Sequence, residues 1–419
     1  MKILVIGGGG REHTIVRKLK ESQRVDKVFC APGNGGISRD ADCVDIPVTD
    51  IDGVVRFAQE NKIDLVFVAP DDPLAAGMVD ALESAGIRAF GPRANAAVIE
   101  SSKVFSKDLM KKYRIPTAGY EVFEDSHRAL DYIRNNNQYP IVIKADGLAL
   151  GKGVIIAADY NEAQDAVKTI MEDKVFGASG NQIVVEEFIT GPEVSVLAFT
   201  DGKCVKPMVS SKDHKRALDG DKGLNTGGMG TISPNPYYSE EMAELCMKTI
   251  FLPTMEAMNR EGRMFKGCLY FGLMLTKDGP KVIEYNSRFG DPETQVVLPR
   301  LKTDFVDILE AVIDERLESQ PIEWSQDACA CVVMASGGYP GKYAKGIEIT
   351  GLNEGGQLEG AIVYHAGTLY RDHKFYTNGG RVLGVTALGK TFNEALEKAY
   401  ASVDKIRFEG AHYRHDIGQ

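Results

Sequence analysis

Short apolar runs alternate with amphipathic stretches along the first hundred residues of the chain. The apolar runs have the length of buried strands and lie at residues 2–6, 27–30, 65–69 and 88–90. The amphipathic stretches repeat apolar side chains every three or four positions and lie at residues 14–22, 53–61 and 74–85. Strands that alternate with helices in this way predict a parallel sheet with helices on both faces. We therefore expect an N-terminal α/β domain with a Rossmann-like, doubly wound parallel sheet.

The pattern changes after residue 101, which predicts a multidomain α/β protein. A helix should end before Pro116, because the residue before a proline is disfavoured in a helix. Strands then surround a glycine-rich loop, and a helix at about 239–261 precedes a hairpin. Strand-rich sequence after Ala328 indicates a small final domain. We place the domains at residues 1–101, 102–325 and 326–419, with a subdomain at about 120–190.

Composition narrows the classes of function. The 419 residues carry a net charge of −10, which argues against nucleic acid as a partner. No apolar stretch approaches the ~20 residues that a membrane-spanning helix needs, so we expect no membrane partner. Seven cysteines at irregular spacing include no CxxC pair, so we expect reduced thiols. We expect a cytoplasmic monomer without a signal peptide.

The glycine-rich stretch GGGGREH follows the first strand and opens the first helix. A dinucleotide-binding loop needs three glycines in a GxGxxG pattern and an acidic residue at the end of the next strand. Here the third position holds His13 or Glu12, depending on the register, and the next strand runs into APGNGG. These departures argue against an NAD-dependent oxidoreductase, which is one alternative function.

Arg11 and His13 instead lie at the start of the helix, where free N–H groups and the helix dipole favour an anion. Asn34 lies in a second loop at the same edge of the sheet. This combination suits a small sugar phosphate better than NAD. The alternative is that the glycines only let the helix pack closely against the strand.

Three later features suit ATP. Lys144 ends an apolar strand, where a lysine is costly unless an anion meets it. The next loop, DGLALGKGV, has glycines around Lys152 and can approach phosphate oxygens closely. It lacks the Walker order, and an ordinary surface loop is the alternative. The stretch IVVEEFITGPEVSV offers backbone groups to adenine and a carboxylate to ribose, unless its acids are only solvated.

The segment KVIEYNSRFGDPETQ places many charged residues at the end of an apolar strand. Strand alternation puts Glu284, Asn286 and Arg288 on one face. Two oxygen ligands two residues apart suit Mg²⁺ that bridges phosphates, and Asp291 and Glu293 could contribute. Arg288 could pair with a carboxylate or a phosphate.

Taken in order, the strand lysine, the glycine-rich loop, the EEFI stretch and the E-x-N-x-R strand resemble the ATP-grasp superfamily. The chain most resembles the glycinamide ribonucleotide synthetase (phosphoribosylamine–glycine ligase) family, over essentially its whole length. This resemblance rests on GGGGREH, APGN, SSKVFSKDLM, KADGLALGKGV, DHKRALDGDKGLNTGGMG, NSRFGDPE, GGYPGKY and GGRVLGV. It implies an ATP-grasp architecture in which residues 102–325 form the ATP-grasp domain and about 120–190 its lid.

The resemblance also implies a reaction and the residues that serve it. ATP, glycine and 5-phosphoribosylamine would give glycinamide ribonucleotide, ADP and phosphate through glycyl phosphate, with Mg²⁺ or Mn²⁺. ATP would be bound by Lys103, Lys144, Gly151, Lys152, Gly153, Glu186, Glu187, Phe188, Ile189 and Glu193. The metal would be held by Glu284 and Asn286. Catalysis would involve Arg288, Asp291, Asp213 and Lys215. The substrates would be bound by Gly9, Gly10, Arg11, His13, Asn34, Gly227 and Gly228, with Arg11, His13 and Asn34 near phosphoribosylamine.

The sequence departs from the family pattern at three places. APDDPL, residues 69–74, stands where the family has G-P-E followed by a small residue and P-L, Lys212 replaces a glutamine, and Leu224 replaces a proline. These departures bear on substrate affinity more than on the reaction class. Two further alternatives stay open: another ATP-grasp ligase or carboxylase, and a catalytically silent nucleotide-binding or scaffold protein.

Overall fold

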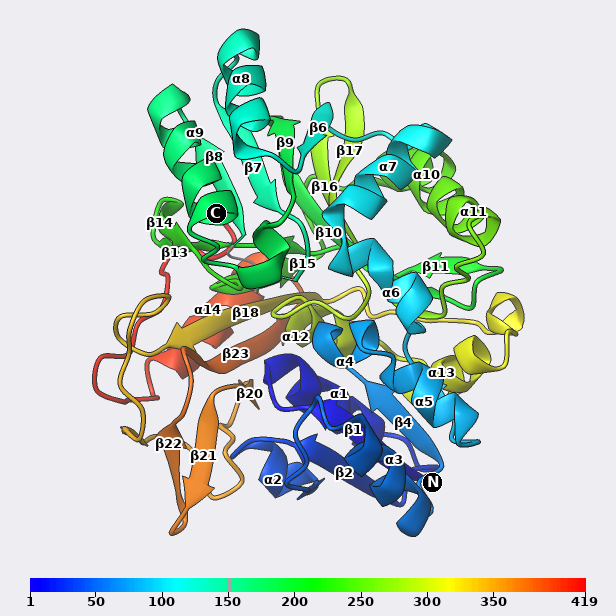
Figure 1. Ribbon diagram of the computed structural model, residues 1–419. Helices are drawn as coiled ribbons and strands as arrows, with labels where there is room; N and C mark the ends of the chain where they lie inside the picture. The colour runs from blue at the N-terminus through cyan, green and yellow to red at the C-terminus, as the bar shows by residue number, and fades with distance from the viewer. Residues whose placement is uncertain (149–152) are drawn as a thin grey trace.

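A computed structural model describes residues 1–148 and 153–419 of the chain (Figure 1). The N-terminal part is a five-stranded sheet of order β3-β2-β1-β4-β5, with all neighbouring strands parallel. Its strands are β1 (Lys2–Gly7), β2 (Lys27–Pro32), β3 (Asp42–Cys43), β4 (Leu65–Val68) and β5 (Ala89–Phe90). Apolar clusters pack on both faces of this sheet, which confirms the doubly wound arrangement.

The N-terminal helices differ in detail from the sequence prediction. They are α1 (Gly10–Lys20), α2 (Ile37–Asp40), α3 (Ile51–Glu60), α4 (Asp71–Ala75), α5 (Met78–Ser84) and α6 (Ala94–Ser101). The single helix expected at residues 74–85 is wrong, because Gly77 adopts a φ of +88° that separates α4 from α5. Helix α1 begins earlier than expected, because the Glu12 carboxylate caps the Gly9 N–H at 2.6 Å.

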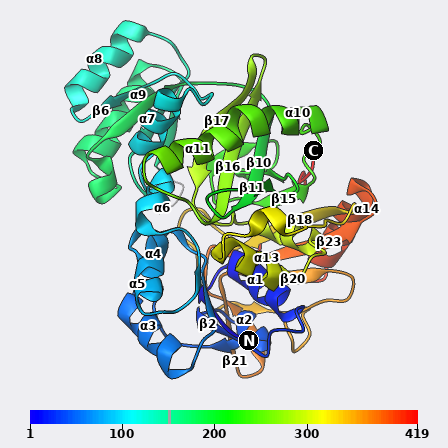
Figure 2. The same ribbon diagram turned by 90° about the vertical axis from the view of Figure 1, so that its right-hand side faces the viewer.

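The middle of the chain forms two antiparallel sheets. The first, of order β6-β9-β7-β8, contains β6 (Tyr120–Phe123), β7 (Ile141–Ala145), β8 (Val154–Ala157) and β9 (Ile183–Glu187). Helices α8 (Ser126–Asn136) and α9 (Tyr160–Val167) pack on it, and Figure 2 shows this unit projecting from the rest. The second, of order β11-β10-β16-β17, contains β10 (Glu193–Thr200), β11 (Val205–Pro207), β16 (Gly267–Thr276) and β17 (Gly279–Asn286).

Helices α7 (Lys103–Tyr113), α10 (Glu240–Cys246) and α11 (Leu252–Arg260) share an apolar cluster with the second sheet. The helix expected at about 239–261 is present, but a π-helical turn at Met247–Phe251 interrupts it. Pro253 follows this turn and has no N–H to donate, which suits a place where the regular hydrogen-bond ladder is already broken.

The C-terminal part is strand-rich, as expected. A sheet of order β12-β15-β18-β23-β20 contains β12 (Lys212–Asp213), β15 (Gly230–Ser233), β18 (Ala328–Ala335), β20 (Ile362–His365) and β23 (Arg381–Gly389). Helix α14 (Phe392–Val403) packs on it, and a small sheet contains β19 (Glu348–Ile349), β21 (Thr368–Arg371) and β22 (Lys374–Thr377). Strands β12 and β15 precede the boundary placed at 325/326 but pair within this sheet.

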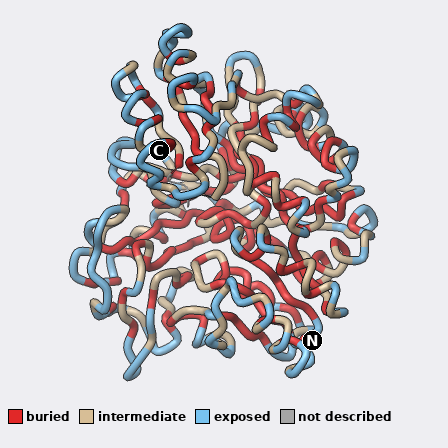
Figure 3. Tube along the Cα trace, viewed as in Figure 1, coloured by how far each residue is buried: buried red, intermediate tan, exposed pale blue. Residues whose placement is uncertain are grey.

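The three parts share one apolar core. It includes Val5 of β1, Phe199 of β10, Phe305 of α13 (Phe305–Ile313) and Cys331 of β18. Figure 3 shows that buried chain is concentrated in the middle of the molecule. Residues that lie at this junction are therefore held from several sides at once.

Candidate functional site

Strand β17 presents Glu284 to a group of cations. Burial alone would raise the pKa of Glu284, but Lys215, Lys144, Lys103 and Arg288 outweigh it and hold the pKa below its usual value. The lysines come from α7, β7 and the segment after β12, so four separate parts of the chain converge on this carboxylate. Carboxylates of the chain also pair with Lys144, Lys215 and Arg288, whereas Lys103 forms no ion pair among the described residues.

A buried ion-pair cluster lies beside this carboxylate. Lys144 Nζ lies 3.0 Å from Oε1 of Glu186, and Lys107 Nζ lies 3.0 Å from its Oε2. Glu186 is only 4% exposed, so its side chain is occupied within the chain and does not face a nucleoside. Burial lowers the pKa of Lys107 to about 8, against the opposing effect of Glu186. The sequence analysis missed Lys107, although it follows Lys103 at the i, i+4 spacing of one helix face.

Lys103 stands at the start of α7, close to the glycine-rich loop. Its Nζ donates to the carbonyl of Gly147 at 2.9 Å, and Asp146 accepts from the N–H of Val104 at 3.1 Å. Burial lowers the pKa of Lys103. Gly153 accepts from the N–H of Ala145 at 2.8 Å, while Gly151 and Lys152 lie outside the described residues.

The remaining residues expected at adenosine lie in the connection between β9 and β10. Glu187 and Glu193 are exposed, and Phe188 and Ile189 are half-buried. The backbone N–H of Glu187 donates to Gly119 at 2.8 Å, so that group is already paired. The connection joins the two antiparallel sheets, and the carbonyl of Pro192 within it accepts from the N–H of Leu275 at 2.9 Å.

Arg288 is held by a buried carboxylate. Its Nη2 lies 2.9 Å from Glu100, whose other oxygen accepts from the N–H and hydroxyl of Ser287 at 2.7 and 2.8 Å. Burial raises the pKa of Glu100, and Arg288 opposes this. Arg288 also donates to Asn286 Oδ1 at 3.3 Å, and it is one of the cations that lower the pKa of Glu284. The structure therefore brings together the three residues that the sequence predicted on one face.

Asp213 and Lys215 lie on the same side of the segment that follows β12. Their charged atoms are 3.4 Å apart, and the Asp213 side chain is only 5% exposed. Its Oδ1 has no hydrogen-bond partner within the described residues. Burial raises the pKa of Asp213, and Lys215 opposes this. A Cβ on Gly228 would lie 2.6 Å from that oxygen, so glycine is needed there for the close approach.

The start of α1 is already occupied by carboxylates of the chain. Glu12 accepts from the N–H of Gly9 at 2.6 Å and from Arg11 Nε at 2.6 Å, and Asp291 accepts from the N–H of Arg11 at 3.3 Å. Arg11 Nη1 donates to Phe289 at 3.1 Å. Burial would raise the pKa of Asp291, but Arg381 and Arg11 hold it below its usual value. Asp291, expected near the phosphoryl transfer, therefore lies at the start of α1.

His13 and Asn34 connect parts of the chain and do not face a ligand. His13 is fully buried; its Nε2 lies 3.0 Å from Asp40, and its Nδ1 accepts from the N–H of His365 at 2.8 Å. Burial lowers its pKa, so it is a neutral ring and not the cation expected at a phosphate. Asn34 donates to Gly8 and His365 at 3.0 and 2.7 Å. Direct substrate binding by these two side chains does not fit this geometry.

Arg381 joins the loops on which several predicted residues lie, and the sequence analysis missed it. Its Nη1 donates to the carbonyls of Gly227 at 2.7 Å and Asp291 at 2.8 Å. Arg381 begins β23 within GGRVLGV, a stretch noted as distinctive. A cation at a strand end within that stretch was the signal that could have identified it. Gly10 lies across from Gln295, whose Nε2 would be 2.6 Å from a Cβ at residue 10.

The described residues contain no cluster of three or more His, Cys, Asp or Glu side chains that could hold a metal alone. Mg²⁺ usually keeps waters and binds through one or two carboxylates plus substrate phosphates, so Glu284 with Asn286 fits such a metal. All seven cysteines are free thiols. Among the described residues, no helix is both long and apolar enough to span a membrane.

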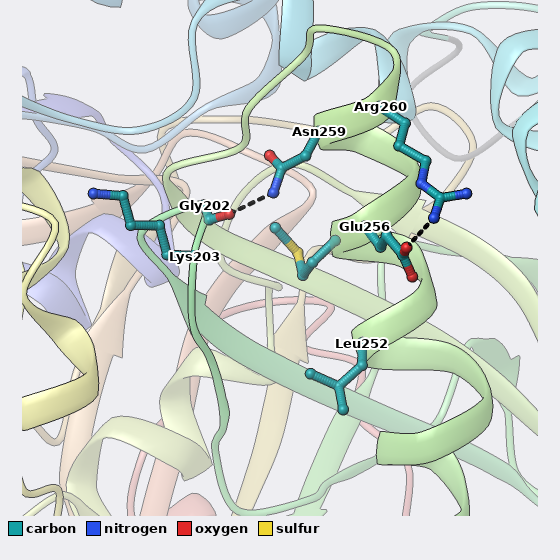
Figure 4. A pocket seen from close by; sticks show the side chains of 7 residues that line it. Gly202, Lys203, Leu252, Glu256, Asn259 and Arg260 are labelled. Atoms are coloured by element: carbon teal, nitrogen blue, oxygen red, sulfur yellow. Dashed lines mark hydrogen bonds and ion pairs between the residues drawn. The ribbon is translucent and has the colours of Figure 1, made fainter.

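A hollow of about 490 Å³ lies away from these residues, between α11 and the turn after β10 (Figure 4). It is lined by Gly202, Lys203, Leu252, Met255, Glu256, Asn259 and Arg260. Its polar groups are paired with one another: Asn259 donates to Gly202 at 2.7 Å, and Arg260 pairs with Glu256. None of the residues expected to bind a substrate lines it.

Family models match nearly all of the chain. The phosphoribosylglycinamide synthetase N domain matches residues 1–100, the ATP-grasp (A) domain of the same family matches 101–294, and its C domain matches 329–419. The chain belongs to the phosphoribosylglycinamide synthetase family. The family membership expected from the sequence motifs is therefore confirmed.

Relatives in the phosphoribosylglycinamide synthetase family extend over the whole chain. A phosphoribosylamine–glycine ligase of Caldanaerobacter subterraneus is 50% identical over 417 residues, which cover 100% of this chain and 99% of that protein. The trifunctional purine biosynthetic protein adenosine-3 of Homo sapiens is 47% identical over 420 residues, which cover 100% of this chain and 42% of that protein.

Solved structures confirm the ATP-grasp architecture. The crystal structure of phosphoribosylamine–glycine ligase from Thermotoga maritima has a TM-score of 0.86 and 33% identity, and each chain covers 100% of the other. The biotin carboxylase domain of 2-oxoglutarate carboxylase from Hydrogenobacter thermophilus has a TM-score of 0.73 at 16% identity, with 98% of this chain and 91% of that chain covered. The second similarity is one of fold alone.

The three departures from the family pattern have different surroundings. Residues 69–74 lead into α4, and Asp71 acts electrostatically on both Glu100 and Arg288. Lys212 donates to the carbonyl of Gln419 at 2.8 Å. Leu224 is 67% exposed on β14 (Lys222–Asn225). Only the first of these departures acts on the charged residues around Arg288.

Proposed function

We propose that this chain is an ADP-forming ligase that joins glycine to 5-phosphoribosylamine and produces glycinamide ribonucleotide and phosphate. The observation that carries the proposal is the group of four cations around Glu284, in a chain whose sequence matches the family from end to end. A triphosphate brings several negative charges, and preorganised cations stabilise such charge best where water is largely excluded. The whole-length relatives that carry the ligase name support the same reaction.

The phosphate-binding residues follow from this charge distribution. We assign Lys103 and Lys144 to the phosphates of ATP, and Glu284 with Asn286 to Mg²⁺ or Mn²⁺. When bound, the metal supplies charge neutralisation at the transferring phosphoryl group. The chain's own contribution is to fix the lysines: Glu186 orients Lys144, and the Gly147 carbonyl orients Lys103. Fixed cations need little reorganisation when negative charge develops.

Asp213 and Lys215 are suited to the amino and carboxylate groups of the small substrates. Asp213 keeps one oxygen free of partners, and a buried acceptor of this kind favours a cationic or N–H donor. Lys215 lies 3.4 Å from the other oxygen and belongs to the group around Glu284. We propose that this pair lies between the phosphates and the amine, with Arg288 opposite, two residues after the end of β17.

The sugar phosphate is assigned to the loops at the start of α1. Gly9, Gly10 and the Arg11 guanidinium lie there, and Gly227 and Gly228 are connected to the same place by Arg381. Arg11 is 11% exposed and shares its Nε with Glu12, so it offers a ligand only part of its hydrogen-bonding capacity. We therefore expect a moderate contribution from Arg11 and none from the ring of His13.

The direct test is ADP release measured by a coupled assay, with phosphoribosylamine generated in place. We expect ADP only when glycine, the amine, ATP and a divalent metal are all present, together with a ribonucleotide product of the mass of glycinamide ribonucleotide. ADP release that ignores glycine would contradict the proposal. Product formed with a different carboxylic acid, but not with glycine, would favour another carboxylate–amine ligase.

A further inference from the structure

Residues 212–216, which comprise β12 and the three residues after it, present alternate residues to opposite sides. Asp213 and Lys215 face the charged site described above. Lys212, His214 and Arg216 contact the segment of residues 412–419 instead, through either a side chain or a carbonyl. Side chains alternate along an extended chain. The contacts that hold Lys212, His214 and Arg216 therefore also fix the direction in which Asp213 and Lys215 point.

Arg414 is the main link between the two segments. Its side chain is 2% exposed, and its Nε and Nη2 form a fork with Asp416 at 2.7 and 2.8 Å. Its Nη1 donates to the carbonyl of Arg216 at 3.2 Å and to Asp221 at 2.8 Å. A planar guanidinium can make all these bonds at once, whereas an ammonium cannot.

His214 makes the second link. Its Nε2 lies 3.1 Å from the backbone nitrogen of Gly418, and its Nδ1 lies 3.2 Å from the carbonyl of Gly230. An amide N–H only donates, so Nε2 is the unprotonated nitrogen and Nδ1 carries the proton that it donates to Gly230. Burial lowers the pKa of His214 to about 4, which keeps this neutral tautomer at neutral pH.

Residues 412–418 are themselves fixed to the C-terminal sheet and to α14. Ala335 of β18 and His412 exchange backbone hydrogen bonds of 2.7 and 2.9 Å. The Tyr400 hydroxyl donates to the carbonyl of Arg414 at 2.9 Å, and Ile417 is 1% exposed. The segment is thus a rigid support for the residues that it contacts.

We propose that Arg414 and His214 are positioning residues that aim Asp213 and Lys215 into the site. This inference rests on the proposed function, because it takes Asp213 and Lys215 to act on the substrates. Neither Arg414 nor His214 touches a substrate in this scheme. Their effect is transmitted through the backbone of residues 212–216, which lies between them and the site.

The test compares Arg414→Ala and Arg414→Lys with Arg24→Ala. Arg24 is a control for the loss of an arginine that pairs with two acidic residues, here Asp307 and Glu310; it is more exposed than Arg414 and lies in another part of the fold. We expect Arg414→Ala to lower kcat by about ten- to a hundredfold, because small misplacements of reacting groups have effects of that size. Arg414→Lys should recover only part, and the KM for ATP should stay within about twofold of the parent.

Amide hydrogen exchange gives a readout that does not need turnover. In Arg414→Ala, the amides of residues 213–216 should exchange faster, while those of β7 and β17 keep the parental rates. If Arg414→Ala does not fold, Asp416→Asn weakens the same fork and should show the same pattern to a smaller degree. Normal kcat and unchanged exchange in a folded variant of either kind would overturn the proposal.

A double-mutant cycle separates failure of this inference from failure of the proposed function. Asp213→Asn should itself lower kcat strongly, and Arg414→Lys should then add little, because both changes act on the same groups. If Asp213→Asn is harmless, the role proposed for Asp213 is wrong. If Asp213→Asn is harmful but the loss from Arg414→Lys adds in full, Arg414 does not act through Asp213, and the positioning inference is wrong.

Discussion

The start of helix α1 and the face of strand β17 both gather cationic groups, but their charges are balanced in different ways. At α1, Glu12 and Asp291 accept from backbone N–H groups and from Arg11, and Asp40 accepts from His13. At β17, four cations act on the single carboxylate of Glu284. At α1 the carboxylates of the chain already accept from the groups that a ligand would need, whereas at β17 Lys103 forms no ion pair among the described residues and can meet a ligand.

This difference shows that a cationic side chain does not by itself identify a ligand-binding site. The groups with which it already pairs must also be known. Arg11 and His13 had the chemistry of phosphate ligands, yet one shares its charge with Glu12 and the other is a buried neutral ring. Lys144 pairs with Glu186, but Lys103 donates to the carbonyl of Gly147 and keeps its charge available to a ligand. Removing a charge should therefore change catalysis at β17 and mainly stability at α1.

The largest effect should follow Glu284→Gln. The variant keeps the shape of the side chain but loses one charged ligand of the phosphate-bridging metal. We expect kcat to fall at least about a hundredfold, or ~2.7 kcal/mol of transition-state stabilisation. Single-turnover and steady-state ADP release at saturating Mg²⁺ would measure this.

The control for that experiment is Glu359→Gln, an equally conservative change at an exposed carboxylate in the C-terminal part of the chain. We expect its kcat to stay close to the parental value. If Glu284→Gln turned over at the parental rate with saturating metal, the assignment of the metal to residue 284 would be wrong, and the contrast between the two regions would lose its basis.

The next effect concerns the other region. His13→Ala should leave the buried N–H of His365 without an acceptor and remove one of the donors to Asp40, which lowers the free energy of unfolding by about 1–3 kcal/mol. Asn at residue 13 can place an acceptor near the position of Nδ1, so His13→Asn should recover part of the loss. Urea denaturation of both variants would measure this.

Ligand affinity decides what the His13 result means. The folded His13→Ala protein should bind the ribonucleotide product with nearly parental affinity, because the ring does not face a ligand. A large loss of product affinity, with stability unchanged, would show that His13 binds the phosphate, and the contrast between the α1 and β17 regions would be wrong.

The sequence analysis predicted well wherever the determining pattern was local. The period of two in β17 was enough to place Glu284, Asn286 and Arg288 on one face, and the structure brings the three together. The alternation of apolar runs and amphipathic stretches was likewise enough to predict the parallel N-terminal sheet. In both cases neighbours in sequence carry the information.

The errors arose where partners are distant in sequence. His13 meets Asp40, 27 residues away, and His365, 352 residues away, so no local pattern could show that its ring is occupied. Arg381 and Arg414 were missed for a similar reason, since the groups through which they connect to the site lie between residues 216 and 291. The domain boundary at 325/326 was likewise placed from the local sequence pattern. The C-terminal sheet, however, also contains β12 and β15, which precede that boundary.

A smaller effect is expected from Arg11→Ala. The guanidinium already pairs with Glu12, so a bound phosphate gains only part of a charge-assisted contact. We expect about a tenfold loss of affinity for the ribonucleotide product, which corresponds to ~1.4 kcal/mol, with ATP affinity unchanged. Calorimetry with each ligand separately would show this. Loss of ATP affinity with product affinity preserved would assign the loop to the nucleotide.

The smallest effect should be a pH dependence of stability that arises from the network around His13. Burial lowers the pKa of His365 to about 3, with a further contribution from neighbouring His13, whereas an unfolded histidine titrates near 6.5. Below pH 6.5 His365 therefore binds a proton in the unfolded chain but stays neutral in the folded chain. Stability from this group is complete above that pH and falls as the solution becomes more acidic, down to the pKa of the folded state.

Between pH 6.5 and 5.5 this one histidine should remove about 1 kcal/mol from the free energy of unfolding. His365→Gln lowers stability at every pH, because the ring's bonds to Gly356 and Thr368 are lost, but it should flatten the slope in this window by that amount. His127→Gln, at an exposed position on α8, should leave the slope as it was. Urea titrations at several pH values would give both slopes. Equal slopes for the parent and His365→Gln would mean that His365 is protonated in the folded state. The region around α1 would then carry an additional positive charge, and the contrast with β17 would be wrong.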